Sequence, residues 1–247
     1  MLTLDGVGEW TTTAIGIGHG NEVTIVEEIK YPHSIGMFYR VFTYFCGFRV
    51  NFGEYKFMGL ALYGKPLYYD KIKENVISIK ADGFFCLNLY YFDFYRGTTM
   101  INDKKFEELF DGPRRQAESR ITRREMDIAA SVQKITEELI IGIAKHAKEK
   151  YGQNIDNLVL AGGVALNCVA NGKLSKEKIF DNVWIQPASD DAGGALGCAF
   201  YTYYEFFKNK RVVEFPDSMG GSLLGPSFTG VEIEKILKKY DAKYVRF

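Results

Sequence analysis

The sequence predicts an α/β fold, and three observations lead to this prediction. Apolar residues recur at helical spacing from 128 to 143, between a capping-box pattern at Thr122 and Glu125 and a glycine stop at Gly152. Two short apolar segments, 158–161 and 183–186, then have the length and composition of buried strands. A Gly/Ala-rich helix start follows each of them. Helices and strands that alternate in this way form α/β folds.

The N-terminal part is expected to contain a meander of strands. Residues 11–17 and 23–29 are rich in Thr, Val and Ile, and Gly20-Asn21 between them suits a hairpin turn. Residues 2–4 also resemble a core strand, but nothing before them supplies neighbouring strands. The chain is therefore expected to begin inside a domain, with an exposed strand edge at this point. The elements expected further along are a helix at 36–48 and strands at 76–80 and 84–92.

Composition limits the classes of function. Of the 247 residues 47% are hydrophobic, which excludes disorder as the main state, and 31 Lys and Arg balance 31 Asp and Glu. No broad attraction to nucleic acid is expected from that balance. The four cysteines lie far apart without a CxxC pair, as is typical of a reduced, cytoplasmic protein. No apolar run approaches the ~20 residues of a membrane helix, so no membrane partner is expected.

Two glycine-containing loops follow the two apolar segments and are the strongest candidates for a ligand site. Gly162 and Gly163 follow the first segment, with Asn167 shortly after them, and Gly193 and Gly194 follow the second. Glycines at a strand-to-helix turn let a ligand approach the backbone, whose N–H groups can hold phosphate or ribose oxygens. Tight helix-on-strand packing explains the first loop equally well. The second loop favours a ligand, because ligands gather at the carboxyl ends of strands in open α/β sheets.

Acidic residues accompany these loops. Asp190 and Asp191 stand at a helix entrance, where a carboxylate either caps the helix or binds a hard cation. Asp5 follows the first strand within DGVGE, and it either forms a turn or points into the same cleft. Glu54 and Lys56 lie between glycines in a separate segment that by itself indicates little.

The histidines and arginines are not expected to form a site. His19, His33 and His146 lack the spacing of zinc ligands, and His146 is interpreted as a surface residue near the end of the long helix. Five arginines between residues 114 and 124, with acidic residues interleaved, are interpreted as a solvated surface.

Five motifs, taken together and in order, resemble the O-carbamoyltransferase family of antibiotic and nodulation-factor tailoring enzymes. They span most of the chain, and the set is far more specific than any one motif. The resemblance implies an actin-like (ASKHA, RNase H-like) α/β fold, which is also used by tRNA threonylcarbamoyl-transfer proteins. The motifs are DGVGEW (5–10), GEYKFMGLALYG (53–64), MDIAASVQ (126–133), LAGGVALN (160–167) and QPASDDAGGALG (186–197).

The resemblance also implies a reaction. Carbamoyl phosphate and ATP would yield carbamoyl-adenylate, and the carbamoyl group would then pass to a hydroxyl of a small-molecule acceptor. Asp5 and Asp191 match the family's acids that bind a divalent metal, Fe²⁺ or Mg²⁺, and motif matching alone selects Asp191 over Asp190. Asp5 and Lys56 are the residues expected to act in catalysis. The residues expected to bind the nucleotide are Gly162, Gly163, Asn167, Glu54, Gly193 and Gly194.

The chain departs from the family pattern at both ends. The family places an HHxxHA helix, whose histidines bind the metal, before the DGxGE segment, and a YrdC-like domain after the region matched here. The expected organisation is 1–66 as the remainder of a first lobe, 67–215 as a second lobe, and 216–247 as a linker and the start of a truncated YrdC-like domain. Without the histidines, metal binding is expected to be weaker and less selective for iron.

Two other classes of function share some of these features. An ASKHA phosphotransferase, such as a sugar or acetate kinase, would use the same Gly-Gly nucleotide loop. A binding or assembly subunit would instead pair with a separate polypeptide that carries the missing histidines, or with a second copy of itself. The exposed edge expected at residues 2–4 favours such a partner.

Overall fold

The computed structural model describes residues 1–97, 99–152, 154–213 and 219–246. Within these ranges the chain forms two compact units, Met1–Asn209 and Lys210–Phe247. The boundary expected between residues 215 and 216 lies outside the described residues. In the described part, no helix combines the length and the apolar character that crossing a membrane requires.

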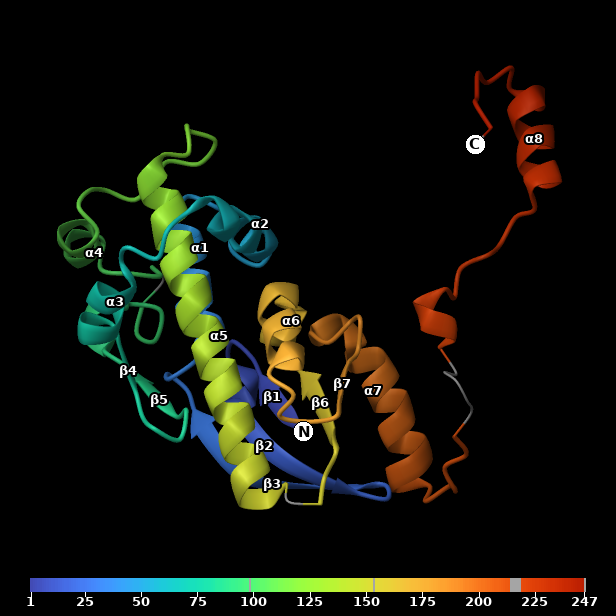
Figure 1. The fold of residues 1–247 in the computed structure, drawn as a ribbon, viewed down its shortest axis with the longest axis horizontal. Coiled ribbons are helices and arrows are strands. Elements are labelled where there is room, and N and C mark those ends of the chain that lie inside the picture. Colours follow the sequence, from blue (N-terminus) through green and yellow to red (C-terminus); the bar gives the residue numbers. More distant parts are fainter. Residues whose placement is uncertain (98, 153, 214–218, 247) are drawn as a thin grey trace. The chain divides into compact units, whose positions relative to one another are not determined.

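The larger unit is built on a five-stranded mixed sheet in the order β3-β2-β1-β6-β7 (Figure 1). β2 runs antiparallel to both of its neighbours, whereas β1, β6 and β7 run parallel to one another. The expected α/β class is confirmed. A boundary between residues 66 and 67 passes through this sheet, because β1, β2 and β3 precede it and the other two strands follow it. The strands are β1 (Leu2–Leu4), β2 (Thr11–His19), β3 (Glu22–Lys30), β6 (Asn157–Ala161) and β7 (Asn182–Ile185).

The expectation of an exposed edge at residues 2–4 is wrong. β1 lies in the middle of the sheet, where Leu2 pairs with Ile15 of β2 on one side and with Leu160 of β6 on the other. Leu2 and Leu4 are completely buried. The missing neighbour of β1 comes from more than 150 residues later in the chain, which is a distance that local sequence patterns do not reveal.

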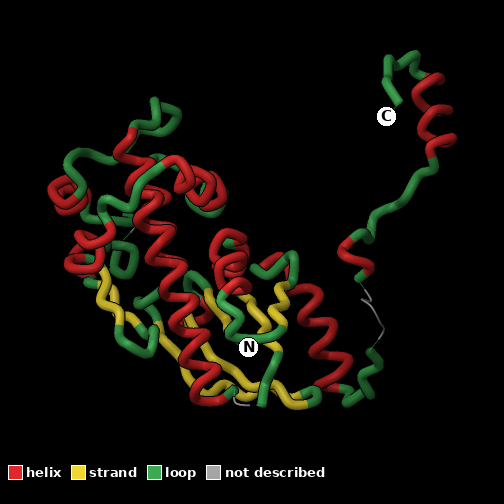
Figure 2. The backbone as a smooth tube through the Cα atoms, in the orientation of Figure 1, coloured by secondary structure: helices red, strands yellow, loops and turns green. Residues whose placement is uncertain are grey.

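Helix α5 (Arg123–Tyr151) is the longest element and matches the sequence prediction. The Glu125 carboxylate accepts hydrogen bonds from the backbone N–H and the hydroxyl of Thr122, at 2.8 and 2.6 Å, and this capping box starts the helix. Gly152 follows its last residue. The C-terminal third of α5 lies against β3 (Figure 2). The remaining helices are α1 (Ile35–Phe45), α2 (Glu54–Leu60), α3 (Tyr69–Asn75), α4 (Asp103–Leu109), α6 (Cys168–Lys176), α7 (Gly194–Phe200) and α8 (Gly230–Lys239).

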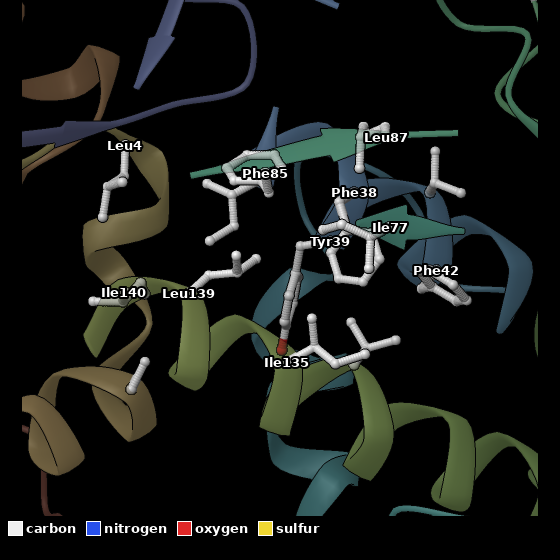
Figure 3. Packing of buried hydrophobic residues seen from close by; sticks show 14 of the residues in the cluster. Leu4, Phe38, Tyr39, Phe42, Ile77, Phe85, Leu87, Ile135, Leu139 and Ile140 are labelled. Carbon is white, nitrogen blue, oxygen red and sulfur yellow. The ribbon is translucent and has the colours of Figure 1, made fainter. Parts of the chain in front are cut away.

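The core lies where α1 packs on α5 and on the sheet. Phe38 and Phe42 of α1 meet edge to face with ring centroids 5.2 Å apart, and both are completely buried. Ile135 and Leu139 of α5 line the same cluster. Figure 3 shows these side chains converging, with the hydroxyl of Tyr39 directed toward α5. The helical spacing in the sequence identified the α5 side of this core.

A small hairpin of β4 (Ile77–Ile79) and β5 (Phe85–Leu87) covers another part of the core. Its turn contains Gly83 at a φ of +81°, and the carboxylate of Asp82 accepts a hydrogen bond from the Phe84 N–H at 3.0 Å. The strand expected at 84–92 is shorter than predicted. Its alternating apolar pattern ends because the chain turns at residues 88–91 into a short 3₁₀ helix, Leu89–Tyr91.

Several helical segments follow the last strand of the sheet in the sequence. A π-helical turn, Tyr201–Phe206, extends α7. In the smaller unit, α8 covers most of the amphipathic segment expected at 231–240, and it begins with a capping box between Thr229 and Glu232. Further 3₁₀ turns are Gly8–Trp10, Ala61–Tyr63, Gly163–Leu166, Asp191–Gly193 and Gly220–Ser222.

Candidate functional site

A cavity of about 760 Å³ lies at the carboxyl ends of the three parallel strands. Asp5 directly follows β1, Gly162 directly follows β6, and Ser189 to Asp191 follow β7 after a short loop. The crevice outside the carboxyl ends of strands is where open α/β sheets bind ligands. The lining residues are Thr3, Asp5, Gly8, Glu9, Thr11, Ala14, Ile25, Val26, Glu27, Glu28, Gly162, Ser189, Asp190, Asp191 and Gly194.

Backbone contacts fix the loop that carries Asp5. The Asp5 N–H donates to the Thr12 carbonyl at 2.8 Å, and its own carbonyl accepts from the Ser34 hydroxyl at 2.9 Å. One carboxylate oxygen of Asp5, Oδ1, accepts from the Gly6 N–H at 2.7 Å. Gly36 lets α1 approach this loop, since a Cβ there would lie 2.7 Å from the Asp5 carbonyl oxygen. The carboxylate therefore has a fixed position at the edge of the cavity.

Gly162 allows the two glycine loops and β1 to meet. Its φ is +92°, and a Cβ would lie 2.3 Å from the Leu4 carbonyl oxygen, so a larger residue does not fit without a shift of the backbone. The Gly162 N–H donates to the Ser189 carbonyl at 2.7 Å. The close-packing explanation for this loop is confirmed at Gly162, which also lines the cavity.

The structure separates the roles of the two adjacent aspartates. Asp190 Oδ1 accepts from the Ala192 N–H at 3.0 Å and so caps the turn that leads into α7. Asp191 is exposed within the same cavity lining. Gly194 also lines the cavity, whereas Gly193 serves the turn, because a Cβ there would lie 2.1 Å from the Ala188 carbonyl oxygen.

The cavity lining is strongly acidic. Six of its residues carry carboxylates, and no described lining residue is Lys, Arg or His. Carboxylate oxygens suit hard cations, and Mg²⁺ is often held by one or two carboxylates together with substrate phosphates. Asp5 and Asp191 fit that role. Within the described ranges, no three His, Cys, Asp or Glu side chains converge as a ligand set, so a metal here would need oxygen ligands from its substrate or from water.

Asn167 lies outside the cavity lining and belongs to a buried polar network. It exchanges two hydrogen bonds with Gln133 of α5, at 3.1 and 3.0 Å, and its Oδ1 also accepts from the Ala170 N–H at 3.0 Å. Gln133 accepts from the Tyr39 hydroxyl at 2.9 Å, and burial raises the pKa of Tyr39, which keeps this donor protonated. The Asn167 amide thus ties the start of α6 to the middle of α5.

Glu54 and Lys56 also do not line the cavity. Glu54 accepts from the N–H groups of Asn51 and Gly53, at 2.9 and 3.1 Å, and so holds the turn before α2. Its carboxylate lies 3.9 Å from the guanidinium of Arg40, which in turn packs on Gly6 beside Asp5. Gly163 stands near the cavity, since a Cβ there would lie 3.6 Å from Asp5 Oδ1.

The interpretation of His146 as a surface residue is wrong. Its Nε2 lies 3.0 Å from Oε1 of Glu27 on β3, and the same carboxylate accepts from Lys150 at 2.7 Å and from Tyr151 at 2.5 Å. Burial alone would raise the pKa of Glu27, but the hydrogen bonds from Lys150, Tyr151 and His146 outweigh it and lower the pKa to about 2. The cluster joins the end of α5 to the sheet.

The solvated-surface interpretation of the arginine run is also wrong in part. Arg115 is buried, and its guanidinium donates to the carbonyls of Cys46, Gly47 and Ser119, at 2.6, 3.2 and 2.5 Å. It holds the end of α1 against the following loop. The charge pattern gave no sign of this, because a buried arginine bound to backbone carbonyls needs no acidic partner in the sequence.

Sequence reasoning missed most of the lining residues that β1, β2 and β3 supply, and Ser189 of the second loop. Glu9 in the turn before β2, Thr11 on β2 and Glu28 on β3 reach the cavity because β2 folds back beside β1 and β3 beside β2. Ser189 belongs to the QPASDDAGGALG motif, but no signal in the sequence distinguishes it from the two acids beside it. The signal that identifies it is structural: it is buried, and its hydroxyl lacks a hydrogen-bond partner among the described residues.

Comparisons with known proteins identify relatives across most of the chain. Residues 1–200 match the model of the carbamoyltransferase N-terminus. The chain is 54% identical over 238 residues to an uncharacterised protein of Synechocystis, covering 96% of this chain and 38% of that protein. It is 33% identical over 199 residues to the nodulation protein NolNO of Sinorhizobium fredii, covering 81% of this chain and 27% of the relative. For the nodulation protein NolO of Bradyrhizobium diazoefficiens the identity is 29% over 225 residues, and the coverage is 91% and 38%.

Proposed function

The chain belongs to the carbamoyltransferase family, and we propose on that basis that its acidic cavity takes part in the transfer of a carbamoyl group to a hydroxyl of a small-molecule acceptor. The donor would be carbamoyl-adenylate, made from carbamoyl phosphate and ATP. The chain spans well under half the length of the relatives described above, so the activity of a whole protein is part of this proposal.

One observation carries the proposal: residues from three of the recognised motifs meet at a single cavity. Asp5 comes from DGVGEW, Gly162 from LAGGVALN, and Asp191 from QPASDDAGGALG, although up to 186 positions separate them in the chain. The MDIAASVQ helix supports the LAGGVALN motif through the Gln133–Asn167 amide pair. The GEYKFMGLALYG motif would position Asp5 indirectly through Glu54 and Arg40.

In this proposal Asp5 and Asp191 hold a divalent cation, for which Mg²⁺ suits the oxygen donors better than Fe²⁺. Bound there, the cation would stabilise negative charge on the phosphoryl oxygens of the adenylate. Gly162 and Gly194 leave room for the ligand beside the backbone. The acceptor hydroxyl would approach across the cavity from the β2–β3 side, where Glu9 and Glu28 provide hydrogen-bond acceptors. Gly163, Asn167 and Gly193 would then support the loops from outside the lining, whereas the catalytic role of Lys56, which is exposed on α2, rests on the motif alone.

The proposal also covers the actin-like fold class and the domain expected after this region. The strand order β3-β2-β1-β6-β7, in which only β2 runs antiparallel to its neighbours, supports an RNase H-like lobe of the actin-like class. The unit Lys210–Phe247 would lead into a YrdC-like domain in a longer protein. The central position of β1 removes the exposed edge that favoured an assembly subunit, so the enzyme remains the preferred function.

Calorimetric titration with AMP, ADP and ATP, with and without Mg²⁺ or Fe²⁺, tests this proposal. The wild-type chain is expected to bind AMP more tightly when Mg²⁺ is present. Asp191→Ala is expected to weaken that binding at least roughly tenfold, because a phosphate-bound cation loses one of its two protein ligands. Asp181→Ala removes an exposed carboxylate outside the cavity and serves as the matched control.

Two results would contradict the proposal. A folded wild-type chain that binds none of these nucleotides would show that the cavity does not serve as the adenylate site. Phosphoryl transfer from ATP to a small hydroxyl compound, without carbamoyl transfer in a reconstituted system, would favour the kinase alternative instead.

A further inference from the structure

Ser189 has an unusual environment within the cavity lining. Only 7% of the residue is exposed, and its Oγ has no hydrogen-bond partner among the described residues. A buried hydroxyl without a partner costs free energy, so folded proteins rarely leave one in place. The helix entrance does not use it, because the adjacent Asp190 supplies the cap to Ala192. The protein itself therefore does not use this hydroxyl within the described residues.

The neighbours of Ser189 decide which ligand atom it would contact. Six carboxylates line the cavity, and these groups accept hydrogen bonds but do not donate them when ionised. The hydroxyl of Thr11 is already used, since it donates to Glu28 at 2.7 Å. The Ser189 O–H is thus a donor among acceptors, and it suits a ligand atom that can only accept, such as a phosphoryl oxygen.

Backbone geometry places this hydroxyl at the junction of the two glycine loops. The Ser189 carbonyl accepts from the Gly162 N–H at 2.7 Å, so the residue is fixed relative to both the β6 and the β7 loops. Asp191, the proposed cation ligand, follows two residues later in the same lining. The Ser189 side chain and the proposed cation ligand thus belong to the same loop of the lining.

From these observations we infer that the Ser189 hydroxyl donates a hydrogen bond to a phosphoryl oxygen of the nucleotide ligand. The inference rests on the proposed function and adds a binding residue to it. Because the donor is preorganised and buried, it contributes to affinity without the entropy cost of ordering a flexible side chain. In the empty protein the same hydroxyl is an unsatisfied group, so it lowers stability while it raises affinity.

Ser189→Ala tests the inference through two opposite effects. The ligand-free variant is expected to melt at a slightly higher temperature than the wild type, because an unpartnered buried hydroxyl has been removed. Its affinity for AMP in the presence of Mg²⁺ is expected to fall roughly tenfold to a hundredfold, which is the range for a hydrogen bond to a charged group. Calorimetric titration and thermal melting measure the two effects on the same samples.

Thr13→Val is the matched control. Thr13 on β2 is also buried, and its hydroxyl also lacks a partner among the described residues, but it does not line the cavity. The variant is expected to melt at the same or a higher temperature than the wild type and to bind AMP with unchanged affinity.

A second ligand, adenosine, lacks the phosphoryl group and so separates its contribution to affinity from that of the nucleoside. Ser189→Ala should leave its affinity unchanged, and failure of adenosine to bind would also locate the affinity in the phosphoryl group.

The outcomes distinguish this inference from the proposal on which it rests. If the wild type binds AMP and Ser189→Ala binds it equally well, the inference is wrong and the proposed function stands. An equal loss of affinity for AMP and adenosine would place the contact on the nucleoside and overturn the phosphoryl assignment. A lower melting temperature for Ser189→Ala would show that the hydroxyl has an internal partner. If the wild type binds no nucleotide at all, both the proposal and the inference fail.

Discussion

At the scale of single residues, the site depends on positions where the backbone restricts the residue type. Gly162 allows the β6 loop to pack against Leu4, and it adopts a φ of +92° that residues with a side chain rarely adopt. Asp190 and Asp191 are both exposed in the cavity lining, but the Asp190 carboxylate already accepts the hydrogen bond from Ala192 that caps the turn. The two adjacent aspartates of the QPASDDAGGALG motif thus differ in role: one caps the turn, and the other is the proposed cation ligand.

The close approach at Gly162 leads to a prediction about stability. Gly162→Ala is expected to lower the free energy of unfolding by about 2–4 kcal/mol, because it combines an unfavourable φ with overpacking against the Leu4 carbonyl. Urea denaturation measures the change. Gly172→Ala in α6 is the control, since a Cβ there meets nothing within 4 Å, and it should stabilise the protein by about 0.5–1 kcal/mol. Equal effects of the two substitutions would show that the loop relaxes freely.

At the scale of elements, α5 connects the parts that form the site. Its middle holds the start of α6 through Gln133 and Asn167, and Lys173 of α6 donates to the Glu137 carboxylate one turn further along. Its C-terminal end reaches Glu27 on β3, a strand that lines the cavity. The helix therefore fixes the distance between the β6 loop and the β2–β3 side of the cavity.

The Glu27 cluster predicts a specific dependence of stability on pH. The pKa of Glu27 in the folded protein is about 2, below its ordinary value of 4.5, so its contribution is fully present above about pH 4.5 and is lost as the pH falls toward 2. Glu27→Gln is expected to lower stability at pH 7 by about 1–2 kcal/mol, because hydrogen bonds to a charged and partly solvated group are lost. Its unfolding free energy should then vary less than that of the wild type between pH 4.5 and 2.

Denaturation of the two proteins at several pH values measures this difference. Glu22→Gln is the control, because Glu22 lies exposed at the turn between β2 and β3. Parallel pH profiles for the wild type and Glu27→Gln would show that the carboxylate is not stabilised by its neighbours.

The elements with strong local signals were the predictable ones. The capping box and apolar spacing identified α5, and Gly20-Asn21 identified the β2–β3 hairpin. The central place of β1 and the burial of Arg115 were not predictable, because each depends on partners far away in the sequence. The same distinction applies to the site. Motifs identified Asp5, Gly162 and Asp191, whereas Glu9, Glu28 and the network around Asn167 required the folded chain.

At the scale of the whole molecule, the described chain has one substantial core. The buried hydrophobic residues run from Leu2 to Phe180, all within the unit Met1–Asn209. Helix α8 in the unit Lys210–Phe247 has no buried residue. Stability and the cavity therefore belong to the first unit, and the second unit contributes a helix whose apolar side chains remain exposed.

This distribution predicts that residues 1–209 fold without the rest of the chain. A protein that ends at Asn209 is expected to unfold cooperatively, with a melting temperature within about 2 °C of the full chain, because every buried hydrophobic residue of the described chain belongs to Met1–Asn209. It should also bind AMP and Mg²⁺ as the full chain does, since all lining residues of the cavity are retained. Thermal melting and calorimetry on both proteins provide the comparison. A much lower melting temperature or a loss of cooperativity would mean that the C-terminal unit stabilises the sheet, and an unchanged fold with lost nucleotide binding would place part of the ligand site beyond Asn209.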